Sequence, residues 1–215
     1  MKIAVLGTGM VGSTIATKLV ELGHEVKMGS RQAGGEKAVA WVKAAGARAS
    51  EGTFADAAAA GALVFNCTPG MAALGALAAA GAKNLAGKIL VDVSNPLDFS
   101  KGVPPSLSVC NTDSVGEQIQ RALPETKVVK ALNTVNASVM VNPALVKGDH
   151  DLFVCGNEGA AKAEVAEILK GWFGWKSVID LGDITAARAQ ESFLLLWVRL
   201  YGALKTPTFN IRVVH

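Results

Sequence analysis

Residues 3–12 read Ile-Ala-Val-Leu-Gly-Thr-Gly-Met-Val-Gly, and they are the most informative part of the chain about its fold. Its four leading apolar residues predict a buried strand that stops at Gly7. Val11, Ile15 and Leu19 then recur at a spacing of four, which predicts one face of a helix. The six residues between strand and helix match the pattern Gly-x-Gly-x-x-Gly. A strand, a glycine turn and a helix in this order predict the first unit of a dinucleotide-binding fold.

Each glycine of this pattern has a physical role. Gly7 makes the tight turn, Gly9 lets a pyrophosphate approach the backbone, and Gly12 lets the helix pack against the strand. The free N–H groups of the helix that begins near Val11 favour negative phosphates. A mononucleotide P-loop is excluded because Ser13 stands where the phosphate-binding lysine would be. The predicted cofactor-binding loop comprises Gly7, Thr8, Gly9, Met10, Val11 and Gly12.

The end of the second predicted strand, residues 25–28, discriminates between the two dinucleotides. An NAD site usually carries a carboxylate there for the ribose 2′-hydroxyl. Here Gly29-Ser30-Arg31 follows instead, so nothing repels a 2′-phosphate. A charge-assisted hydrogen bond from Arg31 is worth roughly 1.5–3 kcal/mol, about a ten- to hundredfold preference for NADP. Lys37, in the next helix, is a further candidate contact, although a solvated surface lysine is the more ordinary interpretation.

Short apolar runs and helix-like segments alternate along the rest of the chain. This alternation predicts a Rossmann-type doubly wound, mainly parallel sheet with extra C-terminal strands and a terminal helix. We expect one NADP-binding domain over residues 1–215, with 183–215 as a helical extension. Strands are expected at 3–6, 25–28, 47–50, 62–65, 89–91, 127–131, 152–155 and 177–180. Helices are expected at 11–22, 36–46, 53–60, 71–80, from 114, from a cap at Asn157, and at 186–204.

Polar residues follow three of the later strands. Cys67-Thr68-Pro69, Asn95-Pro96 and Asn133-Thr134-Val135 each stand where a predicted strand ends. Each could be an ordinary turn, since these residue types favour turns for local reasons. Ligands of open parallel sheets bind at the carboxyl ends of strands, so together they predict the floor of one cleft. We expect the first two groups to contact the dinucleotide.

Composition excludes several classes of protein. Half of the 215 residues are hydrophobic and 18% are charged, so the chain is not a disordered tail. The net charge of +3 comes without a dense basic block, which disfavours nucleic acid as a partner. Residues 57–82 carry no charge, but Asn66 to Gly70 break them, so we expect no membrane span. The apolar run at 3–6 is too short for a secretory signal, and a cytoplasmic protein is expected.

Other chemistries find little support. His24, His150 and His215 have no partners at zinc-binding spacing, and no metal site is expected. The nucleophile pattern Gly-x-Ser-x-Gly is absent. Asp92 is interpreted as a strand-end cap and Asp98 as a loop carboxylate. No catalytic acid or base can be named from the sequence.

The quoted motifs together resemble a known family. Gly7 to Gly12, Gly29-Ser30-Arg31, Thr68-Pro69, Asn95-Pro96-Leu97 and residues 130–134, Lys-Ala-Leu-Asn-Thr, occur in the order of the NADPH-dependent oxidoreductases of the deazaflavin coenzyme F420. The set also resembles the related cytosolic domain of membrane ferric reductases. The resemblance covers nearly the whole chain.

The resemblance implies direct hydride transfer between NADP(H) and a deazaflavin or flavin, a small-molecule acceptor. It implies that Thr8, Ser30 and Arg31 hold the adenosine phosphate and that Asn133, Thr134 and Val135 approach the acceptor. The archaeal enzymes tend to carry His-Thr-Ile-Pro where residues 133–136 here read Asn-Thr-Val-Asn. This departure leaves the acceptor less well defined than the dinucleotide.

Two other functions remain open. One is an NADPH-dependent reductase of a small carbonyl or imine, although such enzymes usually add a large helical domain. The other is a non-catalytic module that senses the NADP redox state. Apolar residues surround most of the predicted terminal helix, from Phe193 to Tyr201, and we expect them to lie in the core or in a homodimer.

Overall fold

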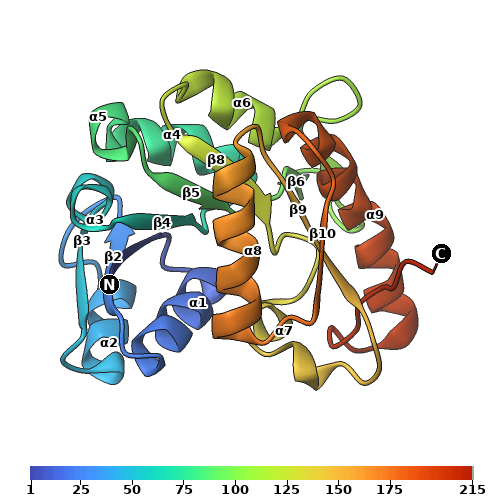
Figure 1. Ribbon diagram of the computed structural model, residues 1–215, viewed down its shortest axis with the longest axis horizontal. Coiled ribbons are helices and arrows are strands. Elements are labelled where there is room, and N and C mark those ends of the chain that lie inside the picture. The colour runs from blue at the N-terminus through green and yellow to red at the C-terminus, as the bar shows by residue number, and fades with distance from the viewer. Residues whose placement is uncertain (215) are drawn as a thin grey trace.

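An eight-stranded sheet runs through the centre of the molecule, with helices on both faces (Figure 1). The computed structural model describes residues 1–214. The strands lie in the order β10-β9-β8-β5-β4-β1-β2-β3, and all neighbours are parallel except β8 and β9. The predicted doubly wound, mainly parallel sheet is confirmed. The strands are β1 (Lys2–Leu6), β2 (Glu25–Ser30), β3 (Ala49–Thr53), β4 (Leu63–Asn66), β5 (Ile89–Asp92), β8 (Lys127–Ala131), β9 (Asp151–Cys155) and β10 (Ser177–Asp180).

The central strand β1 shows why both faces need helices. Ile3 and Val5 belong to one buried cluster, whereas Ala4 and Leu6 belong to a second one on the opposite side of the sheet. The helices are α1 (Met10–Glu21), α2 (Glu36–Ala45), α3 (Phe54–Ala60), α4 (Gly70–Ala80), α5 (Ala82–Leu85), α6 (Val115–Ala122), α7 (Ala137–Val141), α8 (Gly159–Phe173) and α9 (Ala187–Leu204), with short 3-10 turns η1 (Pro143–Leu145) and η2 (Ile184–Ala186). Helices α1 and α8 cover the first cluster, and α3, α4 and α6 cover the second.

Two local predictions were wrong. The third strand begins at Ala49 and not at residue 47, because Gly46 adopts a φ of +87° and accepts a hydrogen bond from Ala49 N–H in a tight turn. Asn157 does not cap α8: its Oδ1 accepts the N–H of Ile184 at 3.1 Å, and Glu158 precedes the helix. The polar side chain therefore ties α8 to the entry of α9.

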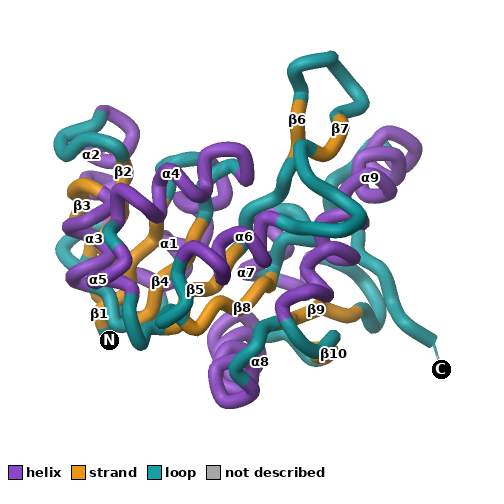
Figure 2. The backbone as a smooth tube through the Cα atoms, turned by 90° about the horizontal axis from the view of Figure 1, so that it is seen from above, coloured by secondary structure: helices purple, strands orange, loops and turns teal. Residues whose placement is uncertain are grey.

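Residues 97–107, between β5 and α6, contain a small hairpin. Strands β6 (Leu97–Asp98) and β7 (Ser106–Leu107) pair antiparallel, and Figure 2 shows this hairpin projecting from the body beside α9. After α9 the chain turns back, and Ile211 C=O accepts the N–H of Asp151 at 2.9 Å. Within residues 1–214, no helix has the length and apolarity that crossing a membrane requires.

Candidate functional site

The glycine loop between β1 and α1 leaves no room for side chains at its ends. Gly7 has a φ of +116°, and a Cβ there would lie 2.8 Å from the Cys67 carbonyl oxygen. A Cβ on Gly12 would lie 2.1 Å from the Gly7 carbonyl oxygen. The start of α1 and the end of β4 therefore pack too closely against the loop to admit a side chain at Gly7 or Gly12. This agrees with the tight turn and the close helix packing that the glycine motif predicted.

The middle glycine faces open space. A Cβ on Gly9 would have no heavy atom within 4 Å, so the backbone there can be approached closely from outside. Gly9 is the N-cap of α1 and offers no side-chain hydrogen bond to the first turn. First-turn N–H groups and the helix dipole therefore stay available to an anion, which is the environment that a pyrophosphate requires. The loop fits a dinucleotide.

A small hollow lies at the end of β2, where the adenosine ribose is expected. It has a volume of about 180 Å³ and is lined by Thr8, Ser30, Gly35, Glu36, Lys37 and Ala38. Arg31 is exposed and does not line the hollow. Ser30 Oγ donates to Gln32 C=O at 2.5 Å, and Glu51 accepts the Gly34 N–H at 3.0 Å. The loop that carries Arg31 is thus held at both ends.

The ends of β4 and β5 are joined through buried polar side chains. Asn66 Nδ2 donates to Asp92 Oδ1 at 2.8 Å, and Thr68 Oγ1 donates to Asn66 Oδ1 at 2.7 Å. Gly70 N–H donates to Asn95 C=O at 3.0 Å, and a Cβ on Gly70 would lie only 2.3 Å from that oxygen. The Thr68-Pro69 and Asn95-Pro96 turns are therefore in direct contact.

A pair of asparagines joins the ends of β5 and β8. Asn95 Nδ2 donates to Asn133 C=O at 2.8 Å, and Asn133 Nδ2 donates back to Asn95 Oδ1 at 2.9 Å. Asn133 Oδ1 and Thr134 Oγ1 are buried without a hydrogen-bond partner among residues 1–214. Val135, which follows, is 5% exposed. The structure thus brings the three predicted strand ends together at one edge of the sheet.

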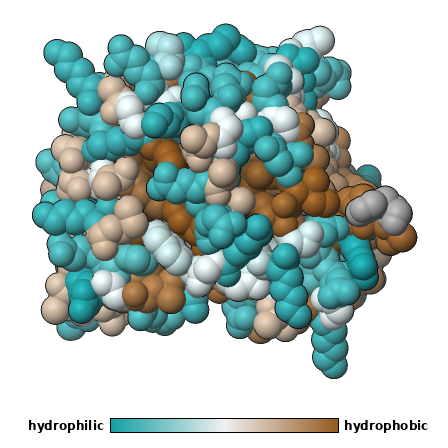
Figure 3. Space-filling model, viewed as in Figure 1, coloured by the Kyte–Doolittle hydropathy of each residue, from teal (hydrophilic) through white to brown (hydrophobic). Residues whose placement is uncertain are grey.

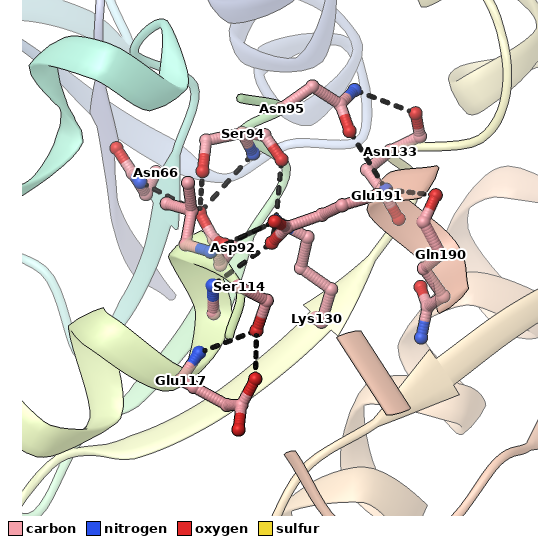
Figure 4. Close-up of polar contacts among 12 residues, drawn as sticks. Asn66, Asp92, Ser94, Asn95, Ser114, Glu117, Lys130, Asn133, Gln190 and Glu191 are labelled. Atoms are coloured by element: carbon pink, nitrogen blue, oxygen red, sulfur yellow. Dashed lines mark hydrogen bonds and ion pairs between the residues drawn. The ribbon is translucent and has the colours of Figure 1, made fainter. Parts of the chain in front are cut away.

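The strand ends at Thr68, Asn95 and Asn133 form the floor of the candidate site. Beneath this floor lies a buried ionic network that the sequence analysis did not predict. The Lys130 ammonium, which is 0% exposed, donates to Asp92 Oδ2 at 2.8 Å, to Ser94 C=O at 2.5 Å and to Glu191 Oε1 at 2.7 Å (Figure 4). Glu191 also accepts the N–H groups of Val115 and Gly116 at the start of α6. The position of Lys130 within an otherwise apolar strand was the one sequence signal for this network, since a lysine in the protein interior needs a charged partner.

Electrostatics keep this lysine charged and the nearby thiol neutral. Burial disfavours the Lys130 ammonium, but Asp92 and Glu191 outweigh that effect and raise its pKa above the ordinary value. Burial, with the Asp92 carboxylate nearby, raises the pKa of the Cys67 thiol, although that residue as a whole is only partly buried. Cys67 therefore borders the floor as a neutral group.

A second buried carboxylate links α6 to α9 and gives the fold a pH dependence. Glu117 accepts from Arg188 Nε at 2.8 Å and from Ser114 Oγ at 2.8 Å. The Arg188 hydrogen bond outweighs burial and holds the pKa of Glu117 below its usual value of 4.5. A lowered carboxyl pKa stabilises the fold above the unfolded pKa, and this contribution disappears as the pH falls through the folded pKa.

Glu117→Gln is therefore expected to lower the unfolding free energy by about 1–2 kcal/mol at pH 7. This value is at the lower end for a charge-assisted hydrogen bond, because Arg188 is partly exposed to solvent. The difference from the parent protein should shrink as the pH falls below 4.5. Urea unfolding at several pH values measures it. A difference that stays constant down to pH 3 would show that the Glu117 charge contributes nothing.

The histidines lie away from the floor. His24 contacts Trp172, with ring centroids 4.3 Å apart, and His150 Nε2 faces Pro143 C=O at 3.1 Å. His215 lies outside the described residues. Among residues 1–214, no group of three or more His, Cys, Asp or Glu side chains is arranged to hold a metal ion.

Fold and site together define a class. A doubly wound sheet, a glycine loop that fits a pyrophosphate and a second strand that ends without a carboxylate are the features of an NADP-dependent oxidoreductase. Comparisons with known proteins agree. Residues 2–96 match the family described as "NADP oxidoreductase coenzyme F420-dependent".

Relatives match over the full chain. The F420-dependent NADP reductase of Methanothermobacter marburgensis is 31% identical over 100% of this chain and 99% of its own length. A crystal structure from Arthrobacter sp. FB24, provisionally described as an F420-dependent NADP-reductase, is 54% identical over 100% of both chains, with a TM-score of 0.94. The chain belongs to the family of F420-dependent NADP reductases.

The rat metalloreductase STEAP3 is also similar, at 30% identity over 96% of this chain. The chain spans only 38% of the length of that relative. The expected relation to membrane ferric reductases is therefore confirmed for the region that the two chains share.

Proposed function

We propose that the protein transfers a hydride directly between NADP(H) and a deazaflavin of the coenzyme F420 type, or a flavin. One observation carries the proposal. A continuous series of contacts runs from Gly7 to Cys67, from Gly70 to Asn95, and from Asn95 to Asn133. A dinucleotide that starts at the glycine loop and follows this floor would end beside Asn133. The names of the relatives support the deazaflavin as the acceptor.

The site residues divide between the two ligands. Backbone groups at Gly7, Gly9 and Gly12, with the adjoining Met10 and Val11, would hold the pyrophosphate. The end of β2 would hold the 2′-phosphate through Thr8, Ser30, Arg31 and Lys37. The ends of β4 and β5 would hold the nicotinamide half through Cys67, Thr68, Pro69, Asn95 and Pro96. Asn133, Thr134 and Val135 would contact the acceptor, where Asn133 Oδ1 and Thr134 Oγ1 have unused hydrogen-bonding capacity.

The chemistry of the floor favours a ring acceptor over a carbonyl or imine. Reduced dinucleotide supplies a hydride when it is bound, and the acceptor ring takes up one proton at a ring nitrogen, which solvent can provide. Facing rings at near-attack distance therefore need positioning and no dedicated proton donor. A carbonyl reductase also needs a proton donor at the reacting oxygen. Lys130 is fully buried and its ammonium already donates to three acceptors, while Asp92 is a buried, paired carboxylate. Neither group is free to donate a proton.

Anaerobic mixing of the protein with NADPH and the deazaflavin, followed by visible absorbance, tests the proposal. Rapid bleaching that is much slower with NADH is the expected result. Bleaching of a flavin alone would assign the flavin, and turnover of only small imines or carbonyls would assign the alternative. Tight NADPH binding without oxidation by any of these acceptors would overturn the catalytic function and leave a redox-sensing module.

We also propose that two copies of the chain associate through the face that carries α9. Leu195, Leu196, Tyr201 and Leu204 are each 44–53% exposed, and Figure 3 shows apolar side chains gathered toward the C-terminal side of the molecule. Large apolar side chains that stand exposed on one helix often mark a protein–protein contact. Light scattering at micromolar concentration should give twice the chain mass of 22.2 kDa. A mass of one chain would contradict the dimer.

A further inference from the structure

Three segments of the chain close a ring of hydrogen bonds around the end of β8. Lys130 donates to Ser94 C=O, the next residue Asn95 pairs with Asn133, and Asn133 Nδ2 donates to Gln190 C=O at 3.2 Å. The ring then closes through Glu191, which follows Gln190 and accepts from Lys130 at 2.7 Å. Figure 4 shows these side chains converging from the ends of β5 and β8 and from α9.

The turn that this ring encloses has an unfavourable backbone. Leu132, between Lys130 and Asn133, has a φ of +65° and is fully buried. A bulky residue such as leucine rarely adopts this left-handed conformation. The conformation persists only where the surrounding structure imposes it. Lys130 holds the residues before Leu132, and the Asn95–Asn133 pair holds the residues after it. Strain of this kind clusters at functional sites.

Each oxygen of Glu191 and each proton of the Lys130 ammonium has a hydrogen-bond partner. The Lys130 ammonium donates to three acceptors, and Glu191 accepts from Lys130 and from the Val115 and Gly116 N–H groups. Glu191 Oε1 accepts from both Lys130 and the Gly116 N–H, and Oε2 accepts from the Val115 N–H. A glutamine at position 191 removes the negative charge and replaces one of these oxygens with an NH2 donor, which would face either Lys130 and Gly116 or the Val115 N–H. Substitution there therefore weakens the hold of α9 on Lys130 without emptying any space.

We infer that Glu191 is a positioning residue: through Lys130 and the adjoining Gln190 carbonyl, the C-terminal helix fixes Asn133 in the geometry that hydride transfer needs. The inference rests on the proposed function, which puts Asn133 beside the acceptor. Misplacing a reacting group by about 1 Å costs on the order of 10²-fold in rate. A role in stability alone would leave the rate constant per folded molecule unchanged.

A double-mutant cycle between Glu191→Gln and Asn133→Ala tests the inference. We expect each single variant to lower kcat by about 10- to 100-fold at saturating NADPH and deazaflavin. The dissociation constant of NADP⁺, measured by tryptophan fluorescence, should change by a smaller factor than kcat, because the glycine loop and the end of β2 lie outside the ring and only Asn95 belongs to both the ring and the proposed dinucleotide site. The double variant should be no slower than Asn133→Ala alone, within about twofold. Multiplicative losses in the double variant would overturn the inference.

Glu117→Gln is the matched control. It also removes a buried carboxylate between α6 and α9, but it lies outside the ring. Its kcat should stay within about twofold of the parent. Equal losses of kcat in Glu117→Gln and Glu191→Gln would assign both to general loosening of α9 and overturn the inference. If Glu191→Gln does not fold, Lys130→Met/Glu191→Gln replaces it in the cycle, because Asp92 then keeps its Asn66 and Ser94 donors.

Amide hydrogen exchange separates failure of the inference from failure of the proposed function. Exchange in residues 131–135 should accelerate at least tenfold in Glu191→Gln and not in Glu117→Gln. If the parent protein does not reduce the deazaflavin but this acceleration occurs, the proposed function fails and the positioning of Asn133 stands. If the parent is active and exchange is unchanged, Glu191 does not position the turn.

Discussion

Arg31→Ala is expected to lower kcat/KM for NADPH by about 10- to 100-fold and to leave the value for NADH within about twofold. The loss corresponds to one charge-assisted hydrogen bond of roughly 1.5–3 kcal/mol. Only NADPH carries the 2′-phosphate that this guanidinium would bind, so the effect must be selective. Steady-state kinetics with both dinucleotides and a saturating acceptor measure it.

Lys37→Ala is the informative companion, because Lys37 lines the hollow at the end of β2 and Arg31 does not. A larger selective loss for Lys37→Ala would make the lysine the main phosphate contact. Arg199→Ala, an exposed arginine on α9, controls for the loss of positive charge. Equal changes for NADPH and NADH in Arg31→Ala would show that the 2′-phosphate does not bind at this strand end.

Alanine substitutions at two glycines of the loop are expected to affect different properties: Gly12→Ala the stability of the fold, and Gly9→Ala the affinity for NADP⁺. Gly12→Ala puts a Cβ 2.1 Å from the Gly7 carbonyl oxygen, so the backbone must shift. We expect a loss of roughly 3 kcal/mol or more in unfolding free energy, at or above the usual cost of overpacking. Gly9→Ala meets nothing within 4 Å, so the fold should be unaffected. The added methyl group would instead occupy the approach to the pyrophosphate, and NADP⁺ affinity should fall about 100-fold, or about 2.8 kcal/mol.

Thermal unfolding and dinucleotide titration on both variants separate the two effects. Gly75→Ala is a suitable control, since this helical glycine also meets nothing within 4 Å and lies outside the loop. Unchanged affinity in Gly9→Ala would mean that no ligand approaches the loop from its open side. A Gly12→Ala variant as stable as the parent would contradict the close packing of β1 and α1.

Local pattern was enough to predict most of the fold. The four apolar residues before Gly7 and the four-residue spacing from Val11 to Leu19 predicted β1 and α1, because strand and helix periodicity are local properties. The third strand was misplaced because Gly46, the C-cap of α2, begins a tight turn in which its C=O accepts the Ala49 N–H, so the strand does not follow the helix directly. The antiparallel run of β9 against β8 could not be read from apolar runs, which carry no direction.

The candidate site was predictable only in part. Thr68, Asn95 and Asn133 were found because polar residues at strand ends meet at one edge of a parallel sheet. The pairing of Lys130 with Glu191 could not be predicted, since 61 positions separate the two residues in the sequence. Only the docking of α9 brings Lys130 Nζ to 2.7 Å from Glu191 Oε1. Partners of this kind depend on tertiary packing, which no local spacing encodes.

Direct passage of the hydride from NADPH to a deazaflavin is the core of the proposed function. A single anaerobic turnover with NADPH deuterated at one face of nicotinamide C4 tests it, with mass spectrometry of both products. We expect that, for one of the two deuterated faces, the label appears in the reduced deazaflavin without exchange into water. Deuterium found in solvent, or retained in NADP⁺ for both faces, would contradict direct transfer.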